Sequence, residues 1–170
     1  MSVEEHRAAA PASSRIAVAI LVVSDTRTIE TDRGGSLAAS LTEAAGFRVS
    51  ARVLARDDGD AIRAGVRALV DGREARAVLV TGGTGFAARD VTVEAVAPLF
   101  ERTIDGFGEL FRMLSFQEVG AAAMLSRAAA GIVAGVPVFL MPGSPAAVKL
   151  ALERLILPDL GHLVGHLGGP

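Results

Sequence analysis

The hydrophobic pattern of the chain alternates between short continuous apolar runs and amphipathic segments. Continuous runs rich in β-branched residues are typical of strands that are buried on both faces of a sheet. Such runs predict strands at residues 16–23, 48–54, 77–81, 131–133 and 136–141. Because helical patterns separate most of them, we predict an α/β fold, a three-layer α/β/α sandwich with a mostly parallel sheet. The two late strands predict an antiparallel hairpin at its edge.

Apolar stripes with helical spacing lie between these runs. The first helix is expected to follow Gly34 and Gly35 and to end at Gly46, and another is expected to begin near Thr92. The stripes themselves are Leu37, Leu41, Ala44 and Ala45; Ile62, Val66, Leu69 and Val70; Phe107, Leu110, Phe111 and Leu114; and Val148, Ala151, Leu152 and Leu155, before Pro158.

A length of 170 residues fits a single domain with ragged ends. Residues 1–14 show no apolar period, which predicts a disordered N-terminal tail. We expect the domain itself to span residues 15–162. Residues 163–170 are rich in glycine and predict a frayed C-terminus.

Composition excludes several classes of function. The absence of cysteine rules out disulfides, thiol catalysis and thiolate zinc sites, and the three histidines lie near the ends of the chain. A formal net charge of −2, without Trp or Tyr, argues against a nucleic-acid surface. The run at 16–23 is far shorter than the roughly 20 residues of a membrane span, so we expect a cytoplasmic protein without a membrane partner.

Polar clusters follow the predicted strands at the point where each strand ends. They are Ser24-Asp25, Asp57-Asp58, Thr81–Gly85 and Pro142–Pro145. In open α/β sheets, ligands bind at the carboxyl edge of the strands, so the spacing predicts one shared site. The alternative is that these loops are polar only because loops after strands require turn residues.

The cluster at Thr81–Gly85 has the composition of an anion cradle. Its glycines allow backbone N–H groups to converge on an oxyanion, and its two threonine hydroxyls add donors, although a plain tight turn has the same spacing. Ser144 and Pro145 are a typical helix N-cap pair, and a helix N-terminus can also hold an anion.

Asp57 and Asp90 each precede a helical segment, so they are either cap residues or catalytic carboxylates. If both face a bound phosphate, a divalent cation such as Mg²⁺ must lie between the charges. Arg27, Arg89 and Arg127 are candidate phosphate clamps.

Five segments together resemble the MoaB/MogA family of molybdenum cofactor biosynthesis proteins, which bind molybdopterin. They are Val23–Arg27, Thr81–Thr92, Gly106–Ser115, Leu125–Arg127 and Met141–Pro145. The resemblance covers residues 16–160 and implies a three-layer α/β fold assembled as a homotrimer or homohexamer. MogA-type members adenylylate molybdopterin with Mg-ATP. The terminal phosphate of the pterin attacks the α-phosphate of ATP, and pyrophosphate leaves.

The resemblance also implies roles for particular residues. Asp57 and Asp90 match two functionally important aspartates, although Asp58 is only one position away, and Asp57 is the candidate Mg²⁺ ligand. The other expected binding residues are Ser24, Asp25, Thr81, Gly82, Gly83, Thr84, Gly85, Ser115, Pro142, Gly143 and Ser144.

Three functions follow from these patterns and from the resemblance. The leading one is a molybdopterin adenylyltransferase with Mg²⁺, ATP and molybdopterin at one site. The second is a non-catalytic molybdopterin-binding or carrier protein of the MoaB type, which hands the pterin to other enzymes of the pathway. The third is a nucleotide- or pterin-binding protein outside this pathway. A hydrophobic content of 51% and a mean hydropathy of +0.44 also favour an oligomer, with Phe107, Phe111 and Phe116 as candidate interface residues, although core positions fit Phe107 and Phe111 equally well.

Overall fold

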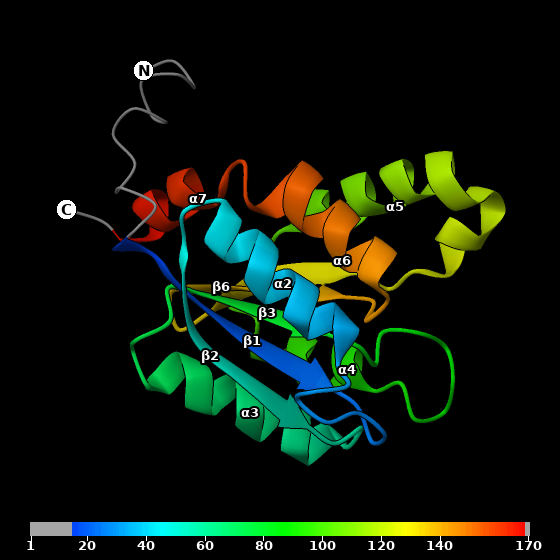
Figure 1. Cartoon of the computed structure of the whole chain (residues 1–170), viewed down its shortest axis with the longest axis horizontal. Coiled ribbons are helices and arrows are strands. Elements are labelled where there is room, and N and C mark those ends of the chain that lie inside the picture. The colour runs from blue at the N-terminus through cyan, green and yellow to red at the C-terminus, as the bar shows by residue number, and fades with distance from the viewer. Residues whose placement is uncertain (1–14, 169–170) are drawn as a thin grey trace.

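A computed structural model describes residues 15–168 as one sheet between two layers of helices (Figure 1). The strands are β1 (Ala17–Val23), β2 (Arg48–Ala55), β3 (Ala77–Thr81), β4 (Arg102–Thr103), β5 (Ala129–Val133) and β6 (Val136–Met141). The six-stranded sheet has the order β2-β1-β3-β6-β5-β4. Neighbours from β2 to β6 pair in parallel, whereas β5 pairs antiparallel with both β6 and β4. The predicted fold class and the edge hairpin are therefore confirmed.

Helices cover both faces of the sheet. One face packs against α2 (Arg33–Ala44), α5 (Asp105–Val119), α6 (Pro145–Ala151) and α7 (Leu160–Leu167), and the other packs against α3 (Gly59–Asp71) and α4 (Thr92–Val96). The remaining elements are two 3-10 helices, η2 (Ala97–Leu99) and η3 (Gly120–Leu125), and a π-helix, η4 (Leu152–Ile156). The helices of each face enclose a separate hydrophobic core. In β1, Ile20 belongs to the core beneath α2, α5, α6 and α7, and Leu21 belongs to the core beneath α3 and α4. This alternation explains the continuous apolar run, because both faces of the strand are buried.

The start of α2 differs from the sequence expectation. Gly34 and Gly35 lie inside the first turn, which Asp32 caps by accepting a hydrogen bond from the Gly35 N–H at 2.9 Å. A Cβ atom on Gly34 would lie 2.4 Å from the carbonyl oxygen of Gly143, so the helix start packs directly on the loop after β6. The predicted stripe is also rotated, since Ala38 and Thr42 are buried, whereas Ala44 and Ala45 are exposed.

The C-terminal end is helical where fraying was expected. Residues 160–167 form α7, in which Leu160 and Val164 are buried in the core that α7 shares with α2, α5 and α6. The expectation of a frayed end from residue 163 is therefore wrong up to residue 167, because the four-residue spacing of these apolar side chains outweighs the surrounding glycines. The tail predicted at residues 1–14 lies outside the described residues. No helix between residues 15 and 168 has the length and apolar character needed to cross a membrane.

Candidate functional site

The four polar clusters lie at one edge of the sheet. Their strands β2, β1, β3 and β6 are parallel neighbours, so all four carboxyl ends point the same way. Backbone hydrogen bonds join adjacent clusters: the Ser24 N–H donates to Ala55 O at 2.9 Å, and the Gly82 N–H donates to Met141 O at 3.0 Å. The Ser24 hydroxyl oxygen in turn accepts from the Thr26 and Arg27 N–H groups and closes the loop after β1.

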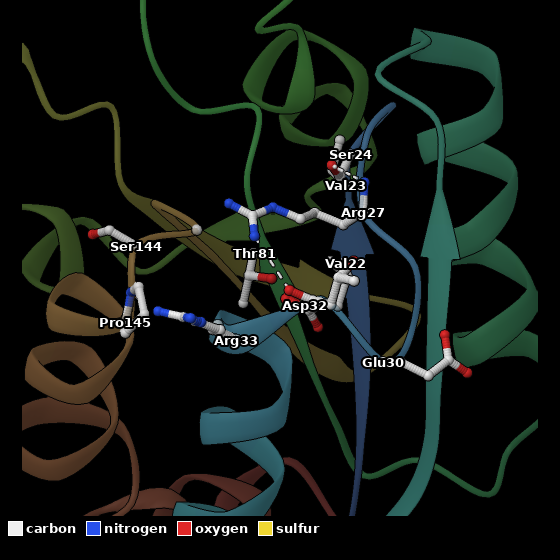
Figure 2. Close-up of a pocket in the computed structure, with 13 residues that line it drawn as sticks. Val22, Val23, Ser24, Arg27, Glu30, Asp32, Arg33, Thr81, Ser144 and Pro145 are labelled. Atoms are coloured by element: carbon white, nitrogen blue, oxygen red, sulfur yellow. Dashed lines mark hydrogen bonds between the residues drawn. The ribbon is translucent and has the colours of Figure 1, made fainter.

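A cavity of about 830 Å³ opens at this edge between the starts of α2 and α6. Four of the predicted binding residues, Ser24, Thr81, Gly143 and Ser144, are among the residues that line it. Figure 2 shows the guanidinium groups of Arg27 and Arg33 reaching into the space between Thr81 and Ser144. The cavity therefore offers two guanidinium groups and hydroxyl groups that can bind an anionic ligand, beside the acidic side chains of Glu30 and Asp32.

Two lining residues of this cavity, Asp32 and Arg33, escaped the sequence analysis. Asp32 is buried, and its Oδ2 atom has no hydrogen-bond partner among the described residues. Its position before a helical stripe is the signal that could have identified it as an N-cap. The glycines that follow it led us to place the helix start later in the chain.

The Gly-rich loop, residues 81–85, adjoins this cavity and turns sharply. Gly82 and Gly83 have φ angles of 98° and 65°, a backbone conformation that favours glycine. The Thr92 hydroxyl donates to Gly82 O at 2.8 Å, and the Thr92 N–H donates to Gly83 O at 3.0 Å. Within residues 15–168, no acceptor is paired with the N–H groups of Gly83, Thr84 or Gly85. These donors are therefore available to an oxyanion.

Asp57 lies beside this loop at the end of β2. Its Oδ1 atom is buried without a hydrogen-bond partner among the described residues, and its backbone N–H donates to Asp25 Oδ1 at 3.1 Å. Burial raises the pKa of Asp57, and the negative charges of Asp25 and Asp90 raise it further, whereas Arg89 lowers it. The folded chain holds this proton more tightly than the unfolded chain does. Ionisation of Asp57 as the pH rises through its folded pKa therefore costs folding stability.

Asp90 and Asp58 have different partners. Asp90 Oδ2 accepts a hydrogen bond from the Ala87 N–H at 2.9 Å and would lie 2.7 Å from a Cβ atom on Gly85. Asp58 is exposed and caps α3 by accepting from the Ala61 N–H at 2.9 Å. Of the two adjacent aspartates, Asp58 is therefore the helix cap, and Asp57 is the carboxylate at the loop.

The carboxylates fit a cation that arrives together with a phosphate ligand. No group of three or more His, Asp or Glu side chains in residues 15–168 is arranged to hold a metal. Mg²⁺ is usually bound by one or two carboxylates plus water and substrate phosphates. The unpartnered Asp57 oxygen, with Asp25 beside it, meets that requirement.

Ser115 lies in a second cavity of about 280 Å³, between the end of α5 and the start of α6. Ser115 is buried, and its neighbours in this cavity include Pro142 and Ser144. Ser144 caps α6 through a hydrogen bond from the Ala147 N–H at 3.3 Å and lines both cavities. Ser115 therefore shares a cavity with Pro142 and Ser144 but does not line the larger cavity.

Comparison with known proteins shows the family. The family described as "Probable molybdopterin binding domain" matches residues 19–162. The Bacillus subtilis protein named molybdenum cofactor biosynthesis protein B is 49% identical over 168 residues, which cover 98% of each chain. The chain belongs to the MoaB/MogA family.

Solved structures of similar proteins have the same fold. A crystal structure of a molybdenum cofactor biosynthesis protein B is 45% identical in sequence, and the match covers 93% of this chain and 99% of the crystallised chain, with a TM-score of 0.90. The tungsten cofactor synthesizing protein MoaB from Pyrococcus furiosus covers 91% of this chain and 98% of its own at 33% identity, with a TM-score of 0.82.

The segments that carry the MoaB/MogA resemblance meet in space. Those at 23–27, 81–92 and 141–145 form the edge of the sheet and the larger cavity. The segment at 125–127 reaches the same place through Arg127, which donates hydrogen bonds to Thr84 O and Asp90 O. The segment at 106–115 contributes Ser115 to the second cavity.

Proposed function

We propose that the chain is a molybdopterin adenylyltransferase. The terminal phosphate of molybdopterin attacks the α-phosphate of Mg-ATP, and pyrophosphate is the leaving group. The observation that carries this proposal is Asp57, whose unpartnered buried oxygen lies near two further carboxylates and beside a glycine loop with available N–H donors. Membership of a molybdopterin-binding family supports the pterin as one substrate, and ATP as the other fits a cytoplasmic location.

Each group at the edge of the sheet has a role in this reaction. The N–H donors of residues 83–85, with Arg27 and Arg33, bind phosphate oxygens. Asp57 and Asp25 hold Mg²⁺, which neutralises phosphate charge when it is bound. Asp90, whose carboxylate accepts a hydrogen bond from the Ala87 N–H, places a further negative charge near Asp57 that would attract Mg²⁺ to the side of the attacking phosphate. Catalysis then depends on positioning and electrostatics, as in other phosphoryl and nucleotidyl transfers.

The second candidate is a protein that binds molybdopterin without catalysis. The observation in its favour is that the similar proteins carry the name molybdenum cofactor biosynthesis protein B. An aspartate at position 57 favours the enzyme, because according to the resemblance some MoaB-type members that look inactive carry another residue there. Pyrophosphate release from ATP that requires both molybdopterin and Mg²⁺ supports the enzyme, and its absence supports the binding protein.

The two adjacent aspartates provide a matched pair of variants. Asp57→Ala should reduce pyrophosphate release at least about 100-fold, while molybdopterin affinity changes little, because the carboxylate acts on Mg-ATP. Asp58→Ala should leave turnover within about threefold and lower stability by about 1 kcal/mol, the typical cost of losing a helix cap. Coupled pyrophosphate assays and thermal melts measure both effects. If Asp57→Ala releases pyrophosphate at the wild-type rate and Asp58→Ala does not, Asp58 is the functional carboxylate. If Asp57→Ala loses molybdopterin affinity to the same degree as turnover, Asp57 contacts the pterin.

We also infer that second copies of the chain cover an apolar surface on α5 and η3. The end of α5 and the turn after it project beyond the sheet (Figure 1). Several large apolar side chains of α5 and η3 are exposed: Leu110, Met113, Phe116, Val119, Met124 and Leu125. Phe107 and Phe111, by contrast, are buried in the core and are not interface residues, and Leu110 does not belong to the buried stripe. Exposed apolar area of this kind usually marks an interface.

Light scattering at micromolar concentration should therefore show a trimer or a hexamer. Phe116→Asp, which places a charge on a side chain that is 62% exposed in the isolated chain, should shift the mass toward the monomer. Gln117→Asp adds the same charge at the neighbouring exposed position and is the control. A monomeric wild-type protein would contradict the inference.

A further inference from the structure

Arg127 lies just before β5, and its side chain is only 22% exposed. The Nε–H donates to Thr84 O at 3.3 Å, and an Nη2–H donates to Asp90 O at 2.8 Å. Nη1 forms an ion pair with Glu94 on α4. The guanidinium carbon also lies 5.2 Å from the centre of the Phe86 ring. A single side chain thus contacts the Gly-rich loop, the segment that follows it, and the helix after that.

These contacts join the two ends of a loop. Thr84 and Asp90 flank residues 85–89, and Arg127 holds their carbonyl oxygens from a different part of the chain. The Ala87 N–H binds the carboxylate of Asp90 from inside the same loop. The main chain of Asp90 is therefore fixed by Arg127, and its carboxylate is fixed by Ala87.

The same contacts argue against Arg127 as a phosphate clamp. A guanidinium has five N–H donors, and three of its N–H groups here are directed at protein oxygens. Its charge is paired with Glu94. Arg27 and Arg33 line the cavity instead, and the Arg89 charge acts on Asp57.

We propose that Arg127 is a positioning residue, which holds the Gly-rich loop and the Asp90 carboxylate in the arrangement that the reaction requires. Its kinetic consequence rests on the adenylyl transfer proposed above, whereas its effect on the loop does not. Loss of the guanidinium should loosen residues 84–91 and leave the sheet intact. Lysine can keep the charge but cannot reach both carbonyl groups and Glu94 in the same planar geometry.

Hydrogen exchange tests the effect on the loop without any assay of activity. In Arg127→Ala, the hydrogen-bonded amides of Ala87 and Asp90 should exchange at least about 10-fold faster than in the wild type, with Arg127→Lys in between. Peptides from β1 and β3 should be unchanged, which shows that the variant is folded. Arg48→Ala, which removes the ion pair of Arg48 with Glu74 at 2.8 Å, is the control and should leave the loop at the wild-type rate. Loop exchange within about twofold of the wild type in Arg127→Ala would overturn the proposal.

Kinetics then separates positioning from ligand binding. Arg127→Ala should lower kcat about 10- to 100-fold with the KM for Mg-ATP within about threefold, and added guanidinium ion should restore part of kcat. A KM that rises about 10-fold or more at unchanged kcat would make Arg127 a phosphate clamp and overturn the proposal. If the wild type transfers no adenylyl group, the proposed function fails, and the exchange experiment alone decides the role of Arg127.

Discussion

Asp90→Asn is expected to abolish most adenylyl transfer while the fold is preserved. The side-chain oxygen of the introduced asparagine can still accept the hydrogen bond that the Ala87 N–H gives to Asp90 at 2.9 Å, so the loop should keep its shape. The negative charge that would attract Mg²⁺ to the side of the attacking phosphate is lost. We expect kcat for pyrophosphate release to fall about 100-fold or more at saturating Mg-ATP, a typical cost of removing one electrostatic contact from a transition state.

Asp58→Asn is the matched control for this change. It makes the same substitution at an exposed aspartate that caps α3, and asparagine caps helices as well as aspartate does. Turnover and thermal stability should therefore stay close to wild type in this variant. Turnover near the wild-type rate in Asp90→Asn would remove Asp90 from the mechanism.

Gly83→Val should prevent ligand binding and weaken the fold. The φ angle of Gly83 is 65°, which a β-branched residue resists, and a Cβ atom there would lie 2.2 Å from the Thr92 hydroxyl and 3.1 Å from Asp57 Oδ1. The backbone strain alone costs about 1–3 kcal/mol, which a domain of this size can survive. Calorimetric titration with molybdopterin and with Mg-ATP should show no binding, while circular dichroism shows an intact sheet.

Two further variants identify the cause of that loss. Gly106→Val places the same side chain at a glycine with open space around it, and ligand affinity should be unchanged. Thr84→Val removes one buried hydroxyl at nearly constant volume and should weaken affinity by about 0.5–3 kcal/mol if that hydroxyl binds the ligand. Unchanged affinity in both Gly83→Val and Thr84→Val would make the Gly-rich loop a structural turn.

The parts of the fold that were predictable from the sequence are those where burial is complete. Strand β3 begins and ends where its apolar run does, because every residue of Ala77–Thr81 is buried. Strand β4 has only two residues, both exposed, and so leaves no pattern to find. In α5, the spacing placed Leu110 on the buried face, yet it is 46% exposed, whereas Phe107 before it and Phe111 after it are buried, so Leu110 lies on a different face of the helix.

The candidate site was predictable in its location more than in its details. The rule that ligands bind at the carboxyl edge of parallel strands predicted that Ser24, Asp57 and Thr81 lie at one edge of the sheet, and they follow neighbouring parallel strands there. Spacing could not separate Asp57 from Asp58, because the difference is tertiary: one carboxylate lies beside Gly83 of the Gly-rich loop, and the other caps a helix. The same limit applied to Arg127, since its partners lie 33–43 residues earlier in the chain.

The most direct test of the account follows the adenylyl group itself. The purified protein is incubated with molybdopterin, Mg²⁺ and ATP labelled in the α-phosphate, and the pterin product is then analysed by mass spectrometry and for label. The account predicts that label appears on molybdopterin together with one pyrophosphate for each pterin modified, and that omission of Mg²⁺ prevents both. Tight binding of molybdopterin with no transfer of label under these conditions would contradict the account and leave a binding protein in its place.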